Sequence, residues 1–238
     1  HVQWVGAEAV AATAQGLRAT LVFGEARHPF ATHIIGRHNL SNLLAVAAVL
    51  VAEGMSPDEI LVRLGKLQPP VGRMACYGGD NAPLVVVDYA HTPDALSHIL
   101  TALRDVATAR GGRLLCLFGC GGDRDPGKRP EMGRAAALQA DAVWITSDNP
   151  RWEDPDAILS MVAAGAPDAL RIADRGQAIA QVIAQAGSTD VVLLAGKGHE
   201  STQEIKGRHY PFDDAVHAQA ALAAWVASHP VSPVRAAV

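Results

Sequence analysis

A run of polar and rigid residues, Ser147 to Arg151, carries the side chains best suited to chemistry in this sequence. Asp148 can accept hydrogen bonds from an ammonium group, and the planar guanidinium of Arg151 matches a carboxylate. Asn149 adds an amide, and Pro150 stiffens the backbone between them. The run therefore predicts a site that holds an amino acid by both of its charges. An Asx-turn closed by proline, with a solvated arginine, is the alternative that these residues alone leave open.

A charged, glycine-rich segment, Gly122 to Arg129, follows an apolar run at Leu114–Phe118 that predicts a strand. It nearly matches the P-loop pattern, but Arg129 stands where that pattern needs the Ser or Thr that ligates Mg²⁺. Two carboxylates in the segment would repel a triphosphate, and the third glycine of a dinucleotide-binding fingerprint is missing. We expect a loop that contributes Arg124 to a small-molecule site, with a plain surface loop as the alternative.

The stretch Asp88 to Pro93 joins a predicted strand to the N-terminus of a predicted helix, where free backbone N–H groups favour an anion. In that setting Asp88 would bind ribose hydroxyls, and His91 would lie beside a phosphate or a base. The alternative is that Thr92 only caps the helix and that His91 only bonds to a nearby carbonyl group.

The stretch Gly196 to Glu200 also follows a predicted strand. Its two glycines let the backbone approach a ligand closely, and Glu200 would accept from an ammonium group. A tight turn with exposed charges is the alternative. No Ser/His/Asp or Cys/His set occurs in a supporting context, so the sequence does not favour nucleophilic catalysis by the protein.

Beyond residue 83, short apolar runs alternate with helical stretches of ten or more residues, which predicts an α/β fold with a Rossmann-like, mostly parallel sheet covered by helices on both faces. Ligands bind at the carboxyl ends of such strands, so the polar stretches, with Ala173–Arg175, are expected to meet at one rim. The predicted strands are Leu84–Val87, Leu114–Phe118, Ala142–Thr146, Leu170–Ala173 and Val191–Ala195, and the predicted helices are Pro93–Thr108, Pro130–Ala140, Pro155–Ala164, Arg175–Ala186 and Asp213–Ala227.

The first seventy residues follow another pattern. Alternating apolar residues predict a hairpin of Leu17–Phe23 and His28–Ile35. Asn39–Glu53 is apolar nearly all round and predicts a buried helix, while a capping box at Ser56 opens a second helix that ends near Leu64. The proline- and glycine-containing segment Leu67–Arg73 predicts a linker, so we place a domain boundary between residues 72 and 73.

Composition limits the function classes. The chain has 238 residues, 49% of them hydrophobic, and a net charge of -4 without a basic run, which argues against nucleic acid or an anionic membrane as the main partner. Its apolar stretches are too short to span a membrane. The three cysteines are odd in number and lack metal-ligand spacing, which indicates reduced thiols in the cytoplasm. Because the first residue is His1, without an initiator Met, we expect the chain to begin inside a longer protein.

Six stretches of the chain are GRHNLSN at 36–42, PVGRM at 70–74, DYAHTPD at 88–94, FGCGGDRDPGKRP at 118–130, DNPR at 148–151 and AGKGHE at 195–200. Taken together and in this order, they resemble motifs of the Mur ligases. They span most of the chain after residue 36, and their joint occurrence is highly specific. In this family DNPR marks the members that choose meso-diaminopimelate as the third amino acid of the peptidoglycan stem peptide. Folylpolyglutamate synthetases share the architecture and something like DYAH, but resembling them would not account for DNPR and AGKGHE.

The resemblance implies an ATP- and Mg²⁺-dependent ligase. ATP would phosphorylate the γ-carboxylate of UDP-N-acetylmuramoyl-L-alanyl-D-glutamate to an acyl phosphate, and the amine of meso-diaminopimelate would then displace phosphate to form an amide. By the same resemblance, Asn39 looks like the adenine contact, Arg73 the phosphate contact and Asp88 the ribose contact, with His91 near the nucleotide. The residues that match the diaminopimelate pocket are Arg124, Asp148, Asn149, Pro150, Arg151, Gly196 and Glu200.

The chain also departs from the family pattern. It lacks an intact P-loop, a uridine-nucleotide domain and a carbamylated-lysine region, and Ala75 stands where a Glu usually follows the GRM arginine, which would leave Arg73 without an ion-pair partner. We expect residues 1–72 to be the end of the central ATP-binding domain and residues 73–238 the complete C-terminal ligase domain, in a monomeric protein whose chain is inactive alone. The rivals are another amide ligase, of the folylpolyglutamate type, and a non-catalytic module that binds a nucleotide or an amino acid.

Overall fold

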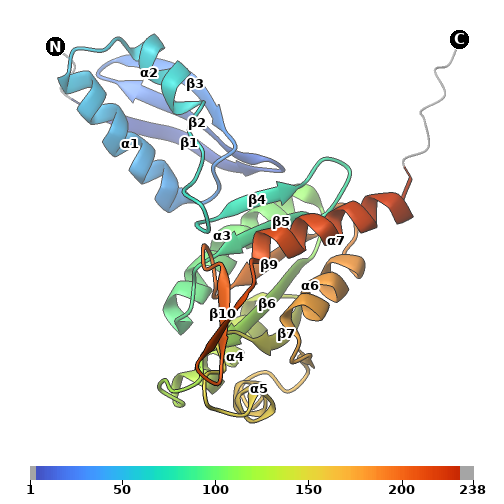
Figure 1. The fold of residues 1–238 in the computed structure, drawn as a ribbon. Coiled ribbons are helices and arrows are strands. Elements are labelled where there is room, and N and C mark those ends of the chain that lie inside the picture. Colours follow the sequence, from blue (N-terminus) through green and yellow to red (C-terminus); the bar gives the residue numbers. More distant parts are fainter. Residues whose placement is uncertain (1–3, 231–238) are drawn as a thin grey trace, which may run out of the picture.

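The computed structural model describes residues 4–230, which form two α/β parts of unequal size (Figure 1). The N-terminal part, residues 4–66, contains a three-stranded antiparallel sheet and two helices. The C-terminal part, residues 74–230, contains a six-stranded, mostly parallel sheet with helices on both faces. Residues 67–73 connect them. Within the described residues, no helix combines the length and the apolarity needed to cross a membrane.

The N-terminal sheet pairs its strands in chain order: β1 (Val5–Thr13), β2 (Gly16–Phe23) and β3 (Ala26–Thr32). The predicted hairpin of β2 and β3 is confirmed, although β3 ends earlier than the sequence indicated. The first strand was not predicted, because β1 is rich in alanine, a residue with low strand propensity.

Two helices cover this sheet, α1 (Arg37–Ala52) and α2 (Pro57–Leu64). The prediction that the first helix is buried on all sides was wrong: one stripe packs on the sheet, while Val46 and Val49 on the outer surface are 42% and 62% exposed. The predicted capping box of α2 is confirmed, since the Ser56 side chain accepts from the Glu59 amide and the Glu59 side chain accepts from the Ser56 amide.

The C-terminal sheet has the strand order β4-β5-β9-β6-β7-β8, with β4 antiparallel to β5 and the other neighbours parallel. This confirms the predicted α/β class. The edge strand β4 was not predicted, and β8 is two residues long, shorter than predicted. The strands are β4 (Ala75–Gly78), β5 (Leu84–Asp88), β6 (Leu114–Cys120), β7 (Ala142–Ser147), β8 (Leu170–Arg171) and β9 (Val191–Ala195).

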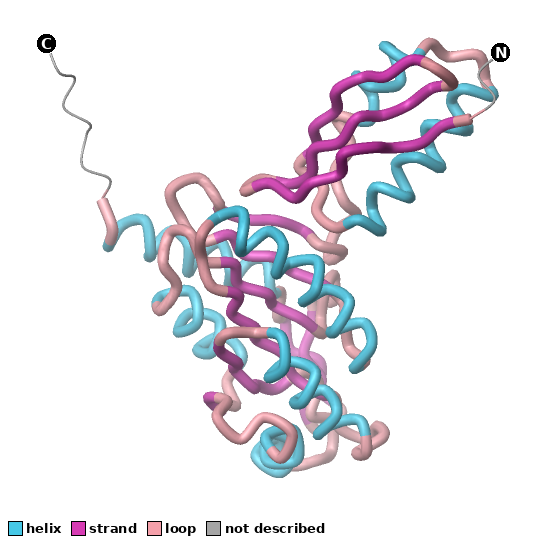
Figure 2. The backbone as a smooth tube through the Cα atoms, turned by 180° about the vertical axis from the view of Figure 1, so that it is seen from behind, coloured by secondary structure: helices cyan, strands magenta, loops and turns pink. Residues whose placement is uncertain are grey.

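Helices lie on both faces of this sheet, as Figure 2 shows from behind. One face packs on α3, α4 and α5, and the other on α6 and α7. Strands β5 and β9 are buried along their whole length, which explains why they are continuous apolar runs rather than alternating ones. The helices are α3 (Pro93–Arg110), α4 (Lys128–Gln139), α5 (Pro155–Ala163), α6 (Arg175–Ala184) and α7 (Asp214–Ser228).

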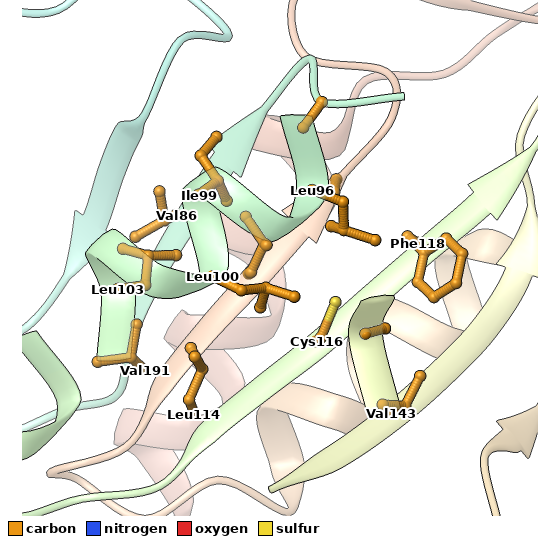
Figure 3. Packing of buried hydrophobic residues seen from close by; sticks show 14 of the residues in the cluster. Val86, Leu96, Ile99, Leu100, Leu103, Leu114, Cys116, Phe118, Val143 and Val191 are labelled. Carbon is orange, nitrogen blue, oxygen red and sulfur yellow. The ribbon is translucent and has the colours of Figure 1, made fainter. Parts of the chain in front are cut away.

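The core under α3 fixes the sheet that carries the site. Figure 3 shows Leu100 and Leu103 of this helix above Val86, Cys116 and Val191 of three neighbouring strands. All five side chains are fully or almost fully buried. Burying one such leucine stabilises a fold by about 1.5–3 kcal/mol, so this contact holds α3 against the sheet.

A two-stranded hairpin, β10 (Thr202–Ile205) and β11 (Arg208–Pro211), projects from the carboxyl end of the sheet (Figure 1). It was not predicted. Its turn residues Lys206 and Gly207 have φ of 49° and 72°, the left-handed pair that tight hairpins require. Lysine is an uncommon first residue for such a turn, so the usual sequence signal was absent.

Candidate functional site

Two cavities lie next to each other at the carboxyl ends of the C-terminal strands. The first, here called the cleft, has a volume of about 830 Å³ and lies between the two parts of the chain. The second, here called the rim cavity, has a volume of about 560 Å³ and is formed by the loops after β5, β6, β7 and β9. Tyr89 and His91 line both, so the two cavities share a wall.

The structure brings Asn39, Arg73, Asp88 and His91 together on the cleft. The N-terminal part contributes Asn39, whose side-chain nitrogen donates to the carbonyl of Ile35 at 2.8 Å. Arg73 comes from the linker, Asp88 is the last residue of β5, and His91 lies in the loop that follows. Residues far apart in the sequence therefore meet in one cavity that has room for a small molecule.

Asp88 organises the floor of the cleft. One carboxylate oxygen accepts from the Met74 amide at 2.9 Å and the other from the Ala90 amide at 2.7 Å. Burial raises the pKa of Asp88 above its ordinary value, although these two amides favour the charged form. Because a carboxylate oxygen can accept two hydrogen bonds, each oxygen keeps one acceptor position beyond its amide.

An aromatic cluster forms the wall that the two cavities share. The Arg73 guanidinium lies 5.1 Å from the centroid of the Tyr89 ring, and the His91 and His199 rings lie 4.7 Å and 5.3 Å from that ring. The Tyr89 ring therefore stabilises the Arg73 guanidinium by a cation–π contact. Ala75, which stands where the family usually has a Glu, has no charge that could pair with Arg73.

His91 has a defined orientation. Its Nδ1 lies 2.8 Å from the carbonyl oxygen of Tyr89. A carbonyl only accepts, so Nδ1 carries the proton in the neutral ring, and Nε2 is left as an acceptor.

Gly198 is required behind this wall. Its φ is 54°, and a Cβ there would lie 2.7 Å from Tyr89 Cβ and 2.8 Å from the Gly72 carbonyl oxygen. The linker and the loop after β9 therefore touch through two glycines, which explains the glycine in both motifs.

The rim cavity carries both signs of charge. Its walls combine guanidinium and ammonium groups with carboxylates, and they include backbone from two glycine-containing loops. Four of the five predicted rim loops line it. The fifth does not, because the side chain of Arg175 is fully buried and forms a bidentate pair with Asp214 at 2.7 Å and 2.6 Å. The charged residues on the walls are Arg124, Asp125, Lys128, Arg129, Asp148, Arg151 and Glu200.

The side chain of Asn149 holds the loops together. Its nitrogen donates to Glu200 Oε2 at 2.9 Å, and its oxygen accepts from Lys197 Nζ at 3.1 Å and from the Glu204 amide at 3.0 Å. Pro150 is buried and does not line the cavity. These two residues shape the wall, while Asp148 and Arg151 present charge on it.

Arg151 is held in a fixed position. Its φ is 51°, and its backbone exchanges hydrogen bonds with the hairpin, from its amide to the Glu204 carbonyl and from the Lys206 amide to its own carbonyl. Its Nη1 donates to the Gly122 carbonyl at 2.7 Å, and its Nε lies 3.1 Å from Glu204 Oε2. An arginine fixed at these two nitrogens retains Nη2 for a planar anion.

Arg129, the residue that breaks the P-loop pattern, is part of the scaffold. Its side chain is 2% exposed, and it donates to both oxygens of Glu153, at 2.8 Å and 2.7 Å, and to the Gly121 carbonyl at 3.2 Å. The hydrogen bond from Arg129 lowers the pKa of Glu153. The pair ties the glycine-rich loop to the segment after DNPR.

The cysteine in this region is not a nucleophile. Cys120 lines the rim cavity, and burial, reinforced by the charge of Asp148, raises the pKa of its thiol to about 12. The thiolate of Cys120 is therefore scarce at neutral pH.

A family model described as "Mur ligase, glutamate ligase domain" matches residues 72–198, which is more than half of the chain. The chain belongs to the Mur ligase family.

Curated relatives in this family are similar along most of the chain. A UDP-N-acetylmuramoyl-L-alanyl-D-glutamate--2,6-diaminopimelate ligase from Ectopseudomonas mendocina is 54% identical over 217 residues, 90% of this chain and 44% of that protein. A ligase of the same name from Ralstonia nicotianae is 55% identical over 194 residues, 80% of this chain and 38% of that protein. The chain therefore spans less than half the length of these relatives.

Solved structures give the same assignment of fold. A structure of a UDP-N-acetylmuramoyl-L-alanyl-D-glutamate--2,6-diaminopimelate ligase superposes with a TM-score of 0.76 at 37% identity, over 95% of this chain and 46% of that one. A folylpolyglutamate synthase from Thermotoga maritima has a TM-score of 0.63 at 18% identity, over 81% of this chain and 43% of that one, and so shares the fold alone.

Within this Mur ligase site, sequence reasoning missed several residues that hold the charged groups. Glu204 pairs with Arg151, Glu153 pairs with Arg129, and Lys197 lies fully buried behind the rim cavity. Only Lys197 lay in a stretch that the sequence had singled out. Nothing in the local pattern around Glu153 or Glu204 distinguishes these residues from exposed carboxylates.

Proposed function

We propose that the longer protein containing this chain is an ATP-dependent Mur ligase that adds meso-diaminopimelate to UDP-N-acetylmuramoyl-L-alanyl-D-glutamate. The observation that carries the proposal is the rim cavity, where a fixed arginine and two carboxylates face a space of about 560 Å³. Diaminopimelate has two carboxylates and two ammonium groups, so it needs cations on some walls and anions on others. Relatives named for this substrate, at more than 50% identity, support the same choice.

In this proposal the rim cavity binds the amino acid and the cleft binds the nucleotide. Arg151 and Arg124 receive carboxylates, Asp148 and Glu200 receive an ammonium group, and Gly196 and Asn149 shape the wall, with Pro150 behind it. On the cleft, Asn39 contacts the adenine, Asp88 the ribose and Arg73 a phosphate, with His91 close by. We likewise propose that residues 1–72 belong to an ATP-binding domain and residues 73–238 to the ligase domain.

The shared wall gives the reaction its geometry. The γ-phosphoryl group of ATP would pass to the substrate carboxylate, with release of ADP. The amine nitrogen of diaminopimelate would then attack the acyl carbon; the C–N bond forms, the bond to the phosphate oxygen breaks, and the amine loses a proton. Residues of this chain hold the amine beside the cleft, and such positioning alone accounts for a large share of catalysis in bimolecular reactions.

The family's Mg²⁺ has no evident protein site here. Among residues 4–230, there is no group of three or more His, Cys, Asp or Glu side chains placed to hold a metal ion. Mg²⁺ commonly keeps waters and binds the phosphates of a nucleotide, so we propose that it arrives with ATP and takes its protein ligands from outside this chain.

The test is substrate-dependent release of ADP by the full-length protein, with the UDP-linked dipeptide and with meso-diaminopimelate, L-lysine or L-glutamate. We expect release with meso-diaminopimelate and less than about one hundredth of that rate with lysine, which lacks the second carboxylate. Release with glutamate but not with diaminopimelate would favour the folylpolyglutamate-type alternative. Binding without any release would favour the non-catalytic module.

The chain by itself is expected to bind substrates without turning them over, because it lacks a P-loop. Amide formation by residues 1–238 alone would contradict this expectation. We also propose a cytoplasmic monomer, since the proposed substrates are all water-soluble small molecules. Light scattering of the full-length protein checks the monomer, and a dimer mass would contradict it.

A further inference from the structure

Lys197 is buried directly behind the wall of the rim cavity. Its side chain has no exposed surface, so it cannot touch a ligand in the cavity. Its Nζ lies 3.1 Å from Asn149 Oδ1, 3.2 Å from Glu200 Oε2 and 3.5 Å from Asp148 Oδ1. An ammonium group has three protons to donate, and here it meets three oxygens from two loops.

Two of these three oxygens belong to carboxylates on the cavity wall. The Lys197 ammonium group faces Oδ1 of Asp148 and Oε2 of Glu200. Asp148 Oδ1 is buried and has no hydrogen-bond partner among the described residues. The contact at 3.5 Å is therefore an electrostatic one without hydrogen-bond geometry. Among residues 4–230, the other oxygens, Asp148 Oδ2 and Glu200 Oε1, receive no hydrogen bond. Each carboxylate thus keeps one free oxygen.

The charges at this wall do not cancel. Two carboxylates meet one ammonium group, while the buried cations Arg175 and Arg129 are paired with Asp214 and Glu153. One negative charge remains, which suits a ligand ammonium group. Without Lys197 the two carboxylates would repel each other and one would turn away or take up a proton.

We propose that Lys197 is the positioning residue of the ammonium subsite: it holds Asp148 and Glu200 so that their free oxygens receive an ammonium group of the amino-acid substrate. The identity of that substrate rests on the proposed function. Lys197 itself acts only through the two carboxylates. A lysine buried at this place without carboxylate partners would destabilise the fold strongly compared with an apolar residue of similar length.

The experiment is a double-mutant cycle in the full-length protein. Lys197→Met, Glu200→Gln and the double variant are compared by initial rates of ADP release at varied meso-diaminopimelate and at varied ATP. We expect Lys197→Met to raise the KM for diaminopimelate about tenfold or more, with the KM for ATP changed less than about twofold. Because Lys197 acts partly through Glu200 and partly through Asp148, the loss in the double variant should be smaller than the product of the two single losses.

Controls separate positioning from general damage. Lys66→Met removes an exposed lysine on the N-terminal part and should leave both KM values unchanged. Lys197→Arg keeps the charge and should recover part of the loss. Thermal unfolding of every variant is recorded, and if Lys197→Met does not fold, Lys197→Arg replaces it in the cycle with a smaller expected increase in KM.

Two failures can be told apart. A wild-type protein whose ADP release ignores diaminopimelate overturns the proposed function. A wild-type protein that responds to diaminopimelate, with a Lys197 variant that keeps the wild-type KM or that weakens ATP equally, overturns the role of Lys197 alone. Losses that multiply in the double variant would also overturn it.

Discussion

Arg129, Arg175 and Lys197 are each at most 2% exposed, and each one meets a carboxylate within hydrogen-bond distance. At the sequence level, Arg129 was a mismatch to a motif and Lys197 was one residue of a turn. Which cations are buried depends on contacts between loops distant in the chain, so local patterns do not reveal it. Arg124, Asp148, Arg151 and Glu200 on the cavity wall could be predicted because each lies in a loop that follows a strand. Glu153 and Glu204, which pair with the arginines, could not.

Asp190 allows a residue-scale prediction at the opposite end of the sheet. Its side chain is 6% exposed, and it accepts from the Arg113 and Gly187 amides and from the Arg113 guanidinium, at 2.7 Å, 2.9 Å and 2.7 Å. Burial alone would raise the pKa of Asp190, but these donors outweigh it and lower the pKa. Asp190→Asn should therefore lower the free energy of unfolding at pH 7 by about 2 kcal/mol.

The pH dependence of this difference has a defined sign. Because the folded pKa of Asp190 lies below the ordinary value, the stabilisation is complete above the unfolded pKa of about 4 and is lost as the pH falls through the folded value. Urea unfolding of wild type and Asp190→Asn should give a constant difference from pH 7 to about pH 5 and a smaller one below. A difference that grows on acidification would contradict the assignment.

At the scale of elements, the alternating strands and helices of the C-terminal part were predictable because most of the strands are continuous apolar runs separated by helices of nine or more residues, with the short β8 as the exception. Four strands were missed: β1, β4, β10 and β11. All but β1 are only four residues long, and the hairpin residues are exposed or half-buried. Their pairing is decided by tertiary contacts such as the bridge between Arg151 and Ile205, for which the sequence gives no periodic signal.

The contact between the glycine-rich loop and DNPR depends on Gly122. A Cβ there would lie 1.9 Å from the carbonyl oxygen of Pro150, whereas a Cβ at Gly127 in the same loop would first meet a flexible side-chain oxygen of Asp125 at 3.2 Å. Gly122→Ala should destabilise the fold by about 1–3 kcal/mol and abolish tight binding of diaminopimelate. Gly127→Ala is the matched control and should change stability by less than about 0.5 kcal/mol.

Chemical denaturation and titration calorimetry of the two alanine variants check this prediction. Equal stability of both variants would contradict the contact between the loops.

At the scale of the whole molecule, Arg110 joins the two parts. Its guanidinium donates to the carbonyl of Ala14 in the N-terminal part at 3.1 Å, and to four carbonyls of the C-terminal part at 2.8–3.1 Å. Burial lowers the pKa of Arg110, although nearby carboxylates favour its charge. The arginine therefore joins the two parts at a point distant from the linker.

Arg110→Ala should lower the free energy of unfolding by about 3 kcal/mol, because several carbonyl groups lose a charged donor at once. Gln15→Ala removes the neighbouring exposed contact to Asp80 and should cost less than about 0.5 kcal/mol. Denaturant unfolding of both variants checks this, and similar small losses in both would contradict the role of Arg110.

We propose that Arg151 makes the rim cavity select an amino acid with a second carboxylate. Titration calorimetry of the full-length protein with meso-diaminopimelate, L-lysine and ATP tests it for wild type, Arg151→Ala and, as a control, Arg208→Ala on the exposed surface of the hairpin. We predict that wild type and Arg208→Ala bind diaminopimelate about a hundredfold or more tighter than lysine. Arg151→Ala should lose most of this preference, while its affinity for ATP should change less than about twofold. An unchanged preference in Arg151→Ala, or equal weakening of diaminopimelate and ATP binding, would contradict this role of Arg151.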